Sequence, residues 1–280
     1  MGKLDGKVAL ITGAARGQGR SHALGLAGEG ADIIAIDIAQ QVGSVPYPLA
    51  SLDDLEETAR LIKGLGRRVV TAQADVRDLA QMQAAVADGL TQLGRIDIVC
   101  ANAGVISAGR VLDLTPEQWN DMIAINLTGV WHTVKAAVPN MVERGEGGSI
   151  IFTGSTSSLG GYPNVGHYVT AKHGIIGLMH TLANELGPQR IRVNAVSPTN
   201  VNTDLLQNST FYKLFRPDLD DPTMEDSLEA FGSMHSLPNL PWVEASDITN
   251  AVLYLATDDS RFVTGVNLPV DGGASQKVGG

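Results

Sequence analysis

The feature of this chain that most constrains its fold is a regular alternation of short apolar runs with helical patterns. Seven runs have the length and composition of buried strands. They span Lys7–Thr12, Ala31–Asp37, Arg68–Gln73, Ile96–Cys100, Ser149–Thr153, Ile191–Val196 and Val266–Val270. Such alternation is typical of βαβ units, which build a parallel sheet covered by helices on both faces. Because parallel crossovers are nearly always right-handed, the sequence predicts a doubly wound α/β fold.

A glycine-rich turn follows the first run. Residues 13–19 are Gly-Ala-Ala-Arg-Gly-Gln-Gly, and a helical pattern begins directly after them. A strand, a glycine turn and a helix start together bring backbone N–H groups close to a pyrophosphate. The second run ends at Asp37, whose carboxylate is placed to accept hydrogen bonds from an adenosine ribose. The spacing differs from the G-x-G-x-x-G motif, but strand, helix and acid together indicate dinucleotide binding.

A second motif, Tyr168-Val-Thr-Ala-Lys172, can provide acid–base chemistry. On a helix, residues four apart lie on the same face, so the tyrosine hydroxyl and the lysine ammonium can meet. Tyrosine alone is a poor base at neutral pH because its pKa is about 10, and a nearby cation lowers that pKa. The pair can therefore accept the proton of an alcohol, provided that a cofactor takes the hydride.

These motifs resemble those of the short-chain dehydrogenase/reductase family, and the resemblance covers nearly the whole chain. It implies a single Rossmann-type domain over residues 1–280. The implied catalytic tetrad is Asn126, Ser155, Tyr168 and Lys172. The implied cofactor contacts lie on the turn, at the strand ends and on the active-site helix, and they are Gly13, Arg16, Gly17, Gln18, Gly19, Asp37, Ile38, Asp75, Val76, Asn102, Ala103, Gly104, Tyr168, Lys172, Pro198, Val201 and Thr203.

The resemblance also implies a role for each member of the tetrad. Tyr168 takes the hydroxyl proton of the alcohol, while Lys172 lowers the pKa of Tyr168 and holds the nicotinamide ribose. Ser155 hydrogen-bonds the substrate oxygen. Asn126 supports a water that relays the proton toward solvent, and a main-chain irregularity in its helix, which the family suggests, would let it reach the site.

Three residues depart from the family pattern. Gln18 stands where an aliphatic residue is usual, Ala101 replaces an asparagine, and Thr199 replaces a glycine after Pro198. None of these changes removes a catalytic group. Gln18 and Thr199 lie where they can alter how tightly the cofactor is held.

The choice between NAD and NADP depends on two opposed residues. Arg16 lies inside the turn, where NADP-using relatives often carry a cation. The Asp37 carboxylate would repel a 2′-phosphate at close range, and this repulsion is large where water is partly excluded. The sequence therefore favours oxidation of an alcohol with NAD. An NADPH-dependent ketone reductase and a nucleotide-sensing protein without turnover stay open as alternatives.

Two stretches exceed what a minimal sheet needs. The insert Ala39–Ala50 follows Asp37 directly, and its two prolines favour an extended path. Its apolar side chains predict that it folds over the adenosine half of the cofactor and slows its release. The region 204–241 mixes aromatic and acidic residues, which favours a substrate loop over simple core packing.

Three segments narrow the resemblance further: residues 13–38, the insert, and Pro198–Leu206. They are similar to the carveol-dehydrogenase-like, mycofactocin-associated oxidoreductases of actinobacteria. This similarity implies a hydrophobic secondary alcohol as substrate, with a cyclic terpenoid such as carveol as one candidate. It also implies a tightly held NAD and mycofactocin as an external electron acceptor. The family further implies a homotetramer, in which the apolar stretch 174–179 could pack against a partner.

Composition and charge argue against several other classes of protein. The net charge of −10 is unsuited to a nucleic-acid partner. No apolar run reaches the length of about 18 residues that a membrane span requires, and no apolar leader precedes the first strand, so we expect a cytoplasmic enzyme. The single cysteine, Cys100, excludes an internal disulfide. We expect no metal, because no cluster has ligand spacing, and we expect His167 and His173 to be solvated helix residues.

Overall fold

The seven predicted strands form one parallel sheet in the order β3-β2-β1-β4-β5-β6-β7. They are β1 (Val8–Thr12), β2 (Asp32–Asp37), β3 (Val69–Gln73), β4 (Ile98–Ala101), β5 (Gly148–Thr153), β6 (Ile191–Pro198) and β7 (Asn267–Val270). The structure, a computed structural model, describes residues 2–277. Every residue of β1 and β2 is buried, as a parallel sheet covered on both faces requires. The predicted doubly wound α/β fold is confirmed.

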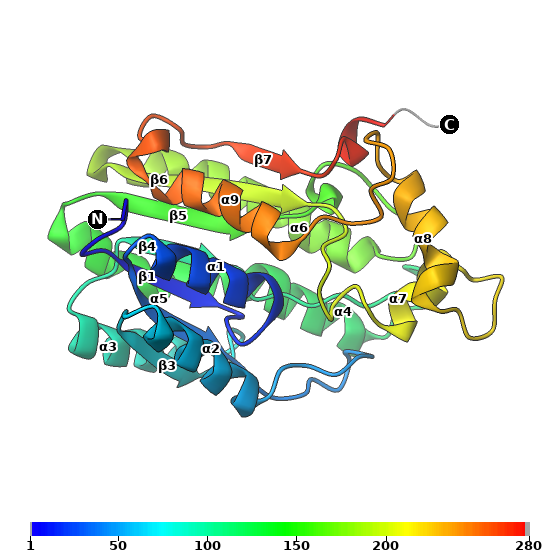
Figure 1. Ribbon diagram of the computed structural model, residues 1–280, viewed down its shortest axis with the longest axis horizontal. Helices are drawn as coiled ribbons and strands as arrows, with labels where there is room; N and C mark the ends of the chain where they lie inside the picture. The colour runs from blue at the N-terminus through cyan, green and yellow to red at the C-terminus, as the bar shows by residue number, and fades with distance from the viewer. Residues whose placement is uncertain (1, 278–280) are drawn as a thin grey trace.

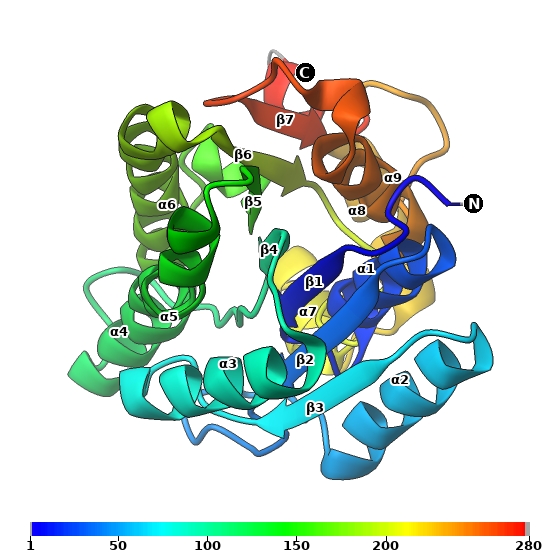
Figure 2. The ribbon, with the colours of Figure 1, turned by 90° about the vertical axis from the view of Figure 1, so that its left-hand side faces the viewer.

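Helices cover both faces of the sheet (Figures 1 and 2). One face carries α1 (Gly17–Gly28), α2 (Leu52–Gly64) and α9 (Ala245–Ala256), and the other carries α3 (Leu79–Leu93), α5 (Gly129–Arg144) and α6 (Gly166–Leu186), with α4 (Pro116–Ile123) packed against α6. Each face buries its own apolar core. Neighbouring residues of β1 alternate between these cores: Leu10 packs toward α3 and α5, whereas Ile11 packs toward α1 and α9.

The strand order reverses between β1 and β4. In open sheets of this kind, ligands bind in the crevice beyond the carboxyl ends of the strands at that reversal. The glycine turn follows β1, Asp37 ends β2, and Asn102 follows β4. Ser155 comes just after β5, so all of these residues lie at one edge of the sheet, on the right in Figure 1.

The region 204–241 contains two helices, α7 (Ser209–Phe215) and α8 (Met224–Ser233), which lie beyond the same edge (Figure 1). Short helical turns complete the described chain: a π-helical turn at Ala124–Thr128 and 3₁₀ turns at Thr156–Ser158, Gly187–Gln189, Asp258–Ser260 and Ala274–Gln276. No helix within residues 2–277 has the length and hydropathy that a bilayer span requires.

Candidate active site

The predicted site residues line one continuous groove at the carboxyl edge of the sheet. Every residue that the sequence predicted to contact the cofactor lines this groove, and so do Asn126 and Ser155. The groove has a cofactor part, bordered by Asp37 and Asp75, and a substrate part, bordered by Tyr168 and Lys172. Six residues line both parts: Gln18, Asn102, Gly104, Val105, Thr203 and Leu205.

The glycine turn is folded so closely that side chains would not fit. Gly13 has a φ of +68°, and a Cβ there would lie 2.9 Å from the Cα of Ala103. A Cβ on Gly19 would lie 1.9 Å from the Gly13 carbonyl oxygen. The side chain of Arg16 does not cap the helix that follows, so the first N–H groups of α1 are left for an anion in the groove. This cradle fits the pyrophosphate of a dinucleotide.

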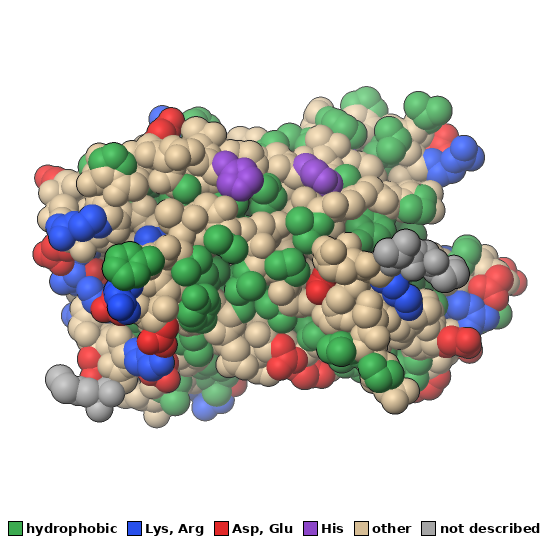
Figure 3. All heavy atoms as spheres, turned by 90° about the horizontal axis from the view of Figure 1, so that it is seen from above, with side chains coloured by type: hydrophobic (Ala, Val, Ile, Leu, Met, Phe, Trp, Pro, Cys, Tyr) green, Lys and Arg blue, Asp and Glu red, His purple; other side chains and the backbone are tan. Residues whose placement is uncertain are grey.

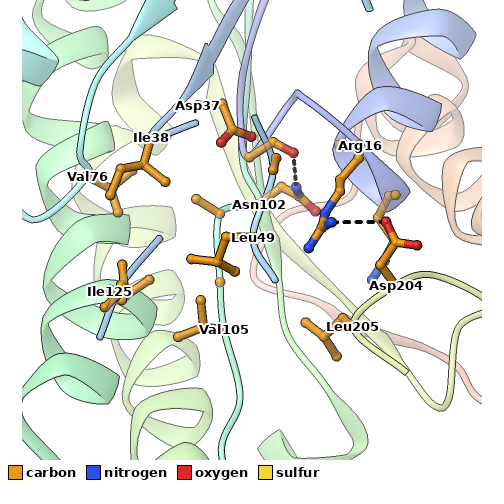
Figure 4. A pocket seen from close by; sticks show the side chains of 18 of the residues that line it. Arg16, Asp37, Ile38, Leu49, Val76, Asn102, Val105, Ile125, Asp204 and Leu205 are labelled. Atoms are coloured by element: carbon orange, nitrogen blue, oxygen red, sulfur yellow. Dashed lines mark hydrogen bonds and ion pairs between the residues drawn. The ribbon is translucent and has the colours of Figure 1, made fainter. Parts of the chain in front are cut away.

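Asp37 and Arg16 border the cofactor part from opposite sides (Figure 4). The buried Asp37 carboxylate accepts hydrogen bonds from the backbone N–H groups of Ala15 and Ala39, both at 2.9 Å. It therefore fixes both the glycine turn and the start of the insert. Arg16 forms an ion pair with Asp204 at 3.2 Å and donates to the carbonyl oxygen of Pro48. The Arg16 guanidinium thus has carboxylate and carbonyl partners already, which leaves it poorly placed to bind a 2′-phosphate.

The insert borders the cofactor part rather than lying apart on the surface. Val42, Tyr47, Leu49 and Ala50 line the groove, and Figure 4 shows Leu49 facing it beside Val105. The Gln41 side chain organises the insert from within. Its amide nitrogen donates to three backbone carbonyls of the insert, and its oxygen accepts from Leu49 N at 2.9 Å.

Ser155, Tyr168 and Lys172 meet in the substrate part. The buried Lys172 donates from Nζ to the carbonyl oxygen of Thr153 at 2.7 Å, and its Nζ lies 5.5 Å from the centre of the Tyr168 ring. Burial raises the pKa of Tyr168 to about 12, and the neighbouring Ser155 hydroxyl opposes this rise. Burial lowers the pKa of Lys172 to about 8. Burial of the phenol therefore sets the net direction of the Tyr168 pKa in this structure. The expectation that Lys172 lowers the pKa of Tyr168 stays a prediction.

The expected irregularity around Asn126 is a π-helical turn between α4 and α5. The fully buried Asn126 amide makes two hydrogen bonds to Val105: its nitrogen donates to the carbonyl oxygen at 3.0 Å, and its oxygen accepts from the N–H at 3.2 Å. The side chain is thus joined to the segment that follows β4. Its oxygen also borders Gly104, as does the Nζ of Lys172, so the two polar groups lie on the same side of the groove.

The substrate part is a largely apolar cavity of about 410 Å³. Its apolar wall includes Tyr162, Val165, Leu206, Phe211, Leu214, Phe215 and Met234. Among the described residues that line it, only Lys172 carries a charge. The region 204–241 supplies one side of this wall, from Leu205 to Met234. Phe231 from the same region is instead fully buried against Phe215 and Trp242. The aromatic residues therefore divide between cavity wall and core.

The prediction for His167 is wrong. This residue was expected to be solvated, yet its ring is fully buried, with Nε2 2.9 Å from the Ser107 hydroxyl. A spacing of four residues places His167 on one helix face with Ala171 and Ile175, which are also buried, so the periodicity of α6 was the available signal. His173 is exposed, as expected.

Comparison with known proteins agrees with this geometry. A family model described as enoyl-(acyl carrier protein) reductase matches residues 13–275. A (-)-trans-carveol dehydrogenase of Rhodococcus erythropolis is 49% identical over 278 residues, which cover 99% of this chain and 100% of that protein. A crystal structure of carveol dehydrogenase from Mycobacterium avium in complex with NAD has a TM-score of 0.97 and 56% identity, covering 99% and 100% of the two chains.

A second solved structure is similar along the same length. It is a short chain dehydrogenase from Mycobacterium paratuberculosis bound to NAD, with a TM-score of 0.90 and 44% identity, covering 99% of this chain and 100% of that chain. The family model covers most of the chain, and the relatives are 44–56% identical to it over nearly its whole length. Such similarity indicates common descent and not only a shared fold. The chain therefore belongs to the short-chain dehydrogenase/reductase family.

Proposed function

We propose that this protein oxidises a hydrophobic secondary alcohol to the ketone, with NAD as hydride acceptor. The observation that carries the proposal is the meeting of Ser155, Tyr168 and Lys172 at an apolar cavity that joins a dinucleotide groove. Relatives named as carveol dehydrogenases support the hydrophobic alcohol as substrate, and relatives with bound NAD support NAD as the cofactor.

The residues of the groove divide the binding of NAD among them. The N-terminus of α1 holds the pyrophosphate, Asp37 holds the adenosine ribose, and Lys172 holds the nicotinamide ribose. Arg16 is engaged by Asp204 and Pro48, which supports NAD over NADP. When bound, NAD supplies the hydride acceptor of the reaction.

The protein's own groups handle the proton. Ser155 hydrogen-bonds the substrate oxygen, and Tyr168 accepts the hydroxyl proton as the carbonyl forms. The positive charge of Lys172 favours the phenolate form of Tyr168 at that moment. Asn126 supports a water that carries the proton to solvent, and its position beside Gly104 and Lys172 is consistent with that path.

The cavity wall indicates the class of substrate. A charged substrate group would lose its hydration in this cavity, and Lys172 is the one charged side chain among the described lining residues that could compensate it. Burial of a charge without a partner is costly. A neutral, largely apolar alcohol fits instead, and a cyclic terpenoid alcohol such as carveol is the candidate that the relatives supply. If the insert retains NAD, the reduced cofactor must be reoxidised in place, and mycofactocin is the proposed external acceptor.

A single-turnover assay tests the proposal without depending on any external acceptor. Protein loaded with NAD is mixed with carveol or with a polar alcohol of similar size, and the absorbance of reduced nicotinamide is followed. Carveol should reduce the bound cofactor stoichiometrically and the polar alcohol should not. Absence of reduction by every hydrophobic alcohol tried would favour a nucleotide-sensing protein, and faster turnover of ketones with NADPH would favour a reductase.

A further inference from the structure

The segment Val105–Ser107 runs along the groove where its two parts meet: Val105 lines both parts and Ile106 lines the substrate part. Side chains from three places in the chain hold this segment. Residues 102–108 belong to no helix or strand, so a strand ladder does not fix their backbone. Asn126 from the π-helical turn makes both hydrogen bonds to Val105. His167 from α6 meets the hydroxyl of Ser107. The residue between them, Ile106, depends on the insert.

Tyr47 supplies that contact. Its hydroxyl oxygen accepts a hydrogen bond from the backbone N–H of Ile106 at 3.2 Å, across 59 residues of sequence. The Tyr47 side chain is buried, only 5% of it is exposed, and it packs in the same core as Val105 and Ile106. Burial raises the pKa of Tyr47 to about 12, so the hydroxyl stays neutral at physiological pH. A buried N–H that loses such a partner is costly, so this contact fixes where Ile106 lies.

Tyr47 therefore connects the two parts of the groove, although it lines only the cofactor part. Its ring lines the cofactor part, while the residue that it holds, Ile106, lines the substrate cavity, and Val105 lines both. We propose that Tyr47 is a positioning residue of the substrate site: through Ile106 it ties the insert to the cavity wall, so that an ordered insert also sets the wall against which the alcohol lies. This inference rests on the proposed function, because the occupant of the cavity is taken to be an alcohol.

The variant Tyr47→Phe removes only the hydroxyl and keeps the buried ring. We expect its KM for a bulky hydrophobic alcohol to rise about tenfold, the equivalent of about 1.4 kcal/mol, with little change in kcat. The KM for a small alcohol that does not reach the wall should change little. Discrimination between the two alcohols should therefore fall, whereas the NAD content of the purified protein should not.

Val45→Ala is the matched control, because Val45 is buried in the same insert but does not line the groove. It should lower the melting temperature and leave the discrimination unchanged. Equal discrimination in the parent and Tyr47→Phe would show that Tyr47 only packs the insert, and would overturn the proposal.

Hydrogen exchange separates this inference from the proposed function, since it needs no substrate. The amide of Ile106 should exchange about tenfold faster in Tyr47→Phe, while the amide of Val105, held by Asn126, should keep its protection. Unchanged exchange at Ile106 would show that Tyr47 does not hold the wall. If the parent oxidises no alcohol, the proposed function fails and the effect on substrate falls with it, but the exchange result still decides whether Tyr47 positions Ile106.

Discussion

At the scale of single residues, burial rather than charge pairing sets the state of the catalytic pair. It raises the pKa of Tyr168 to about 12 and lowers that of Lys172 to about 8. Each group is thus driven toward its neutral form, as desolvation requires. Lys172 keeps its proton at neutral pH and loses it above about pH 8. Neutral to mildly alkaline solution is therefore the range in which a charged Lys172 can still support the Tyr168 phenolate.

Replacing Tyr168 by Phe should remove most turnover and leave the fold intact. The change deletes one hydroxyl, and general acid–base groups contribute roughly 10²–10⁴-fold to rates. Single-turnover reduction of bound NAD by an alcohol is the measurement, with NAD content and melting temperature as controls. A Phe variant with near-normal kcat would exclude Tyr168 as the proton acceptor.

Replacing Asp37 by Ala should weaken discrimination against NADP by about tenfold or more. The carboxylate would lie close to a 2′-phosphate, and like charges a few ångströms apart cost about 1–4 kcal/mol near a protein surface. Titration of both cofactors into cofactor-free protein measures the ratio of dissociation constants. Asp53→Ala makes the same change of net charge at an exposed position and should leave that ratio unaltered. A parent protein that already prefers NADP would contradict the role given to Asp37.

At the scale of elements, sequence patterns identified what depends on local composition and missed what depends on distant contacts. The apolar runs located all seven strands to within about two residues. The inner strands β1 and β2 are apolar because both of their faces are buried, whereas the outer strands β3 and β7 are partly exposed. The helices α7 and α8 were not predicted, since each is short and two prolines lie between them. Their positions depend on packing of Phe215 against Phe231, which no local pattern reports. The contact from Tyr47 to Ile106 is hidden for the same reason.

Replacing Asp97 by Asn should destabilise the protein by on the order of 3 kcal/mol, the scale of breaking a buried ion pair. Asp97 precedes β4, is buried, and pairs with Arg95 at 2.5 Å and Arg144 at 2.9 Å. It also accepts from Val8 N at 3.0 Å, so it joins β4 to β1. Chemical denaturation of parent and variant at neutral pH measures the difference. An unchanged free energy of unfolding would mean that the arginines find other partners.

The same carboxylate makes a prediction about acid stability. The neighbouring arginines and the Val8 N–H hold the pKa of Asp97 below its ordinary value of 3.8, although burial alone would raise it. Its contribution is therefore fully present above that ordinary pKa and is lost as the pH falls through the lower folded-state pKa. The stability gap between parent and Asp97→Asn should close at acid pH.

At the scale of the whole molecule, one face exposes several hydrophobic side chains. Figure 3 shows hydrophobic side chains gathered along it, and β7 is the outer strand of the sheet on that side. Val266 beside β7 is 40% exposed, and Ile176 and Leu178 of α6 are only half-buried. We expect a homotetramer in solution, because self-association would cover such surface. Sedimentation that finds only monomer at micromolar concentration would contradict this.

The last prediction concerns how the molecule holds its cofactor. The insert contacts the far side of the groove, because Arg16 binds both Pro48 and Asp204, and the Thr210 hydroxyl lies 3.4 Å from the Pro46 carbonyl oxygen. An insert that is held at both sides of the groove should slow the release of NAD, since affinity differences among related complexes lie mostly in the off-rate. Protein purified without added cofactor, dialysed extensively and then denatured should release near-stoichiometric NAD.

Asp204→Ala tests the connection directly. The ion pair is partly exposed, so its loss should speed release of NAD by only about two- to fivefold. Asp218→Ala is the control, because Asp218 lies in the same region and pairs with Arg216 instead. Equal release rates of NAD in the two variants would show that Asp204 does not help the insert to retain the cofactor. Parent protein that emerges free of cofactor and oxidises alcohol rapidly with added NAD would show that the insert borders the groove without trapping what it binds.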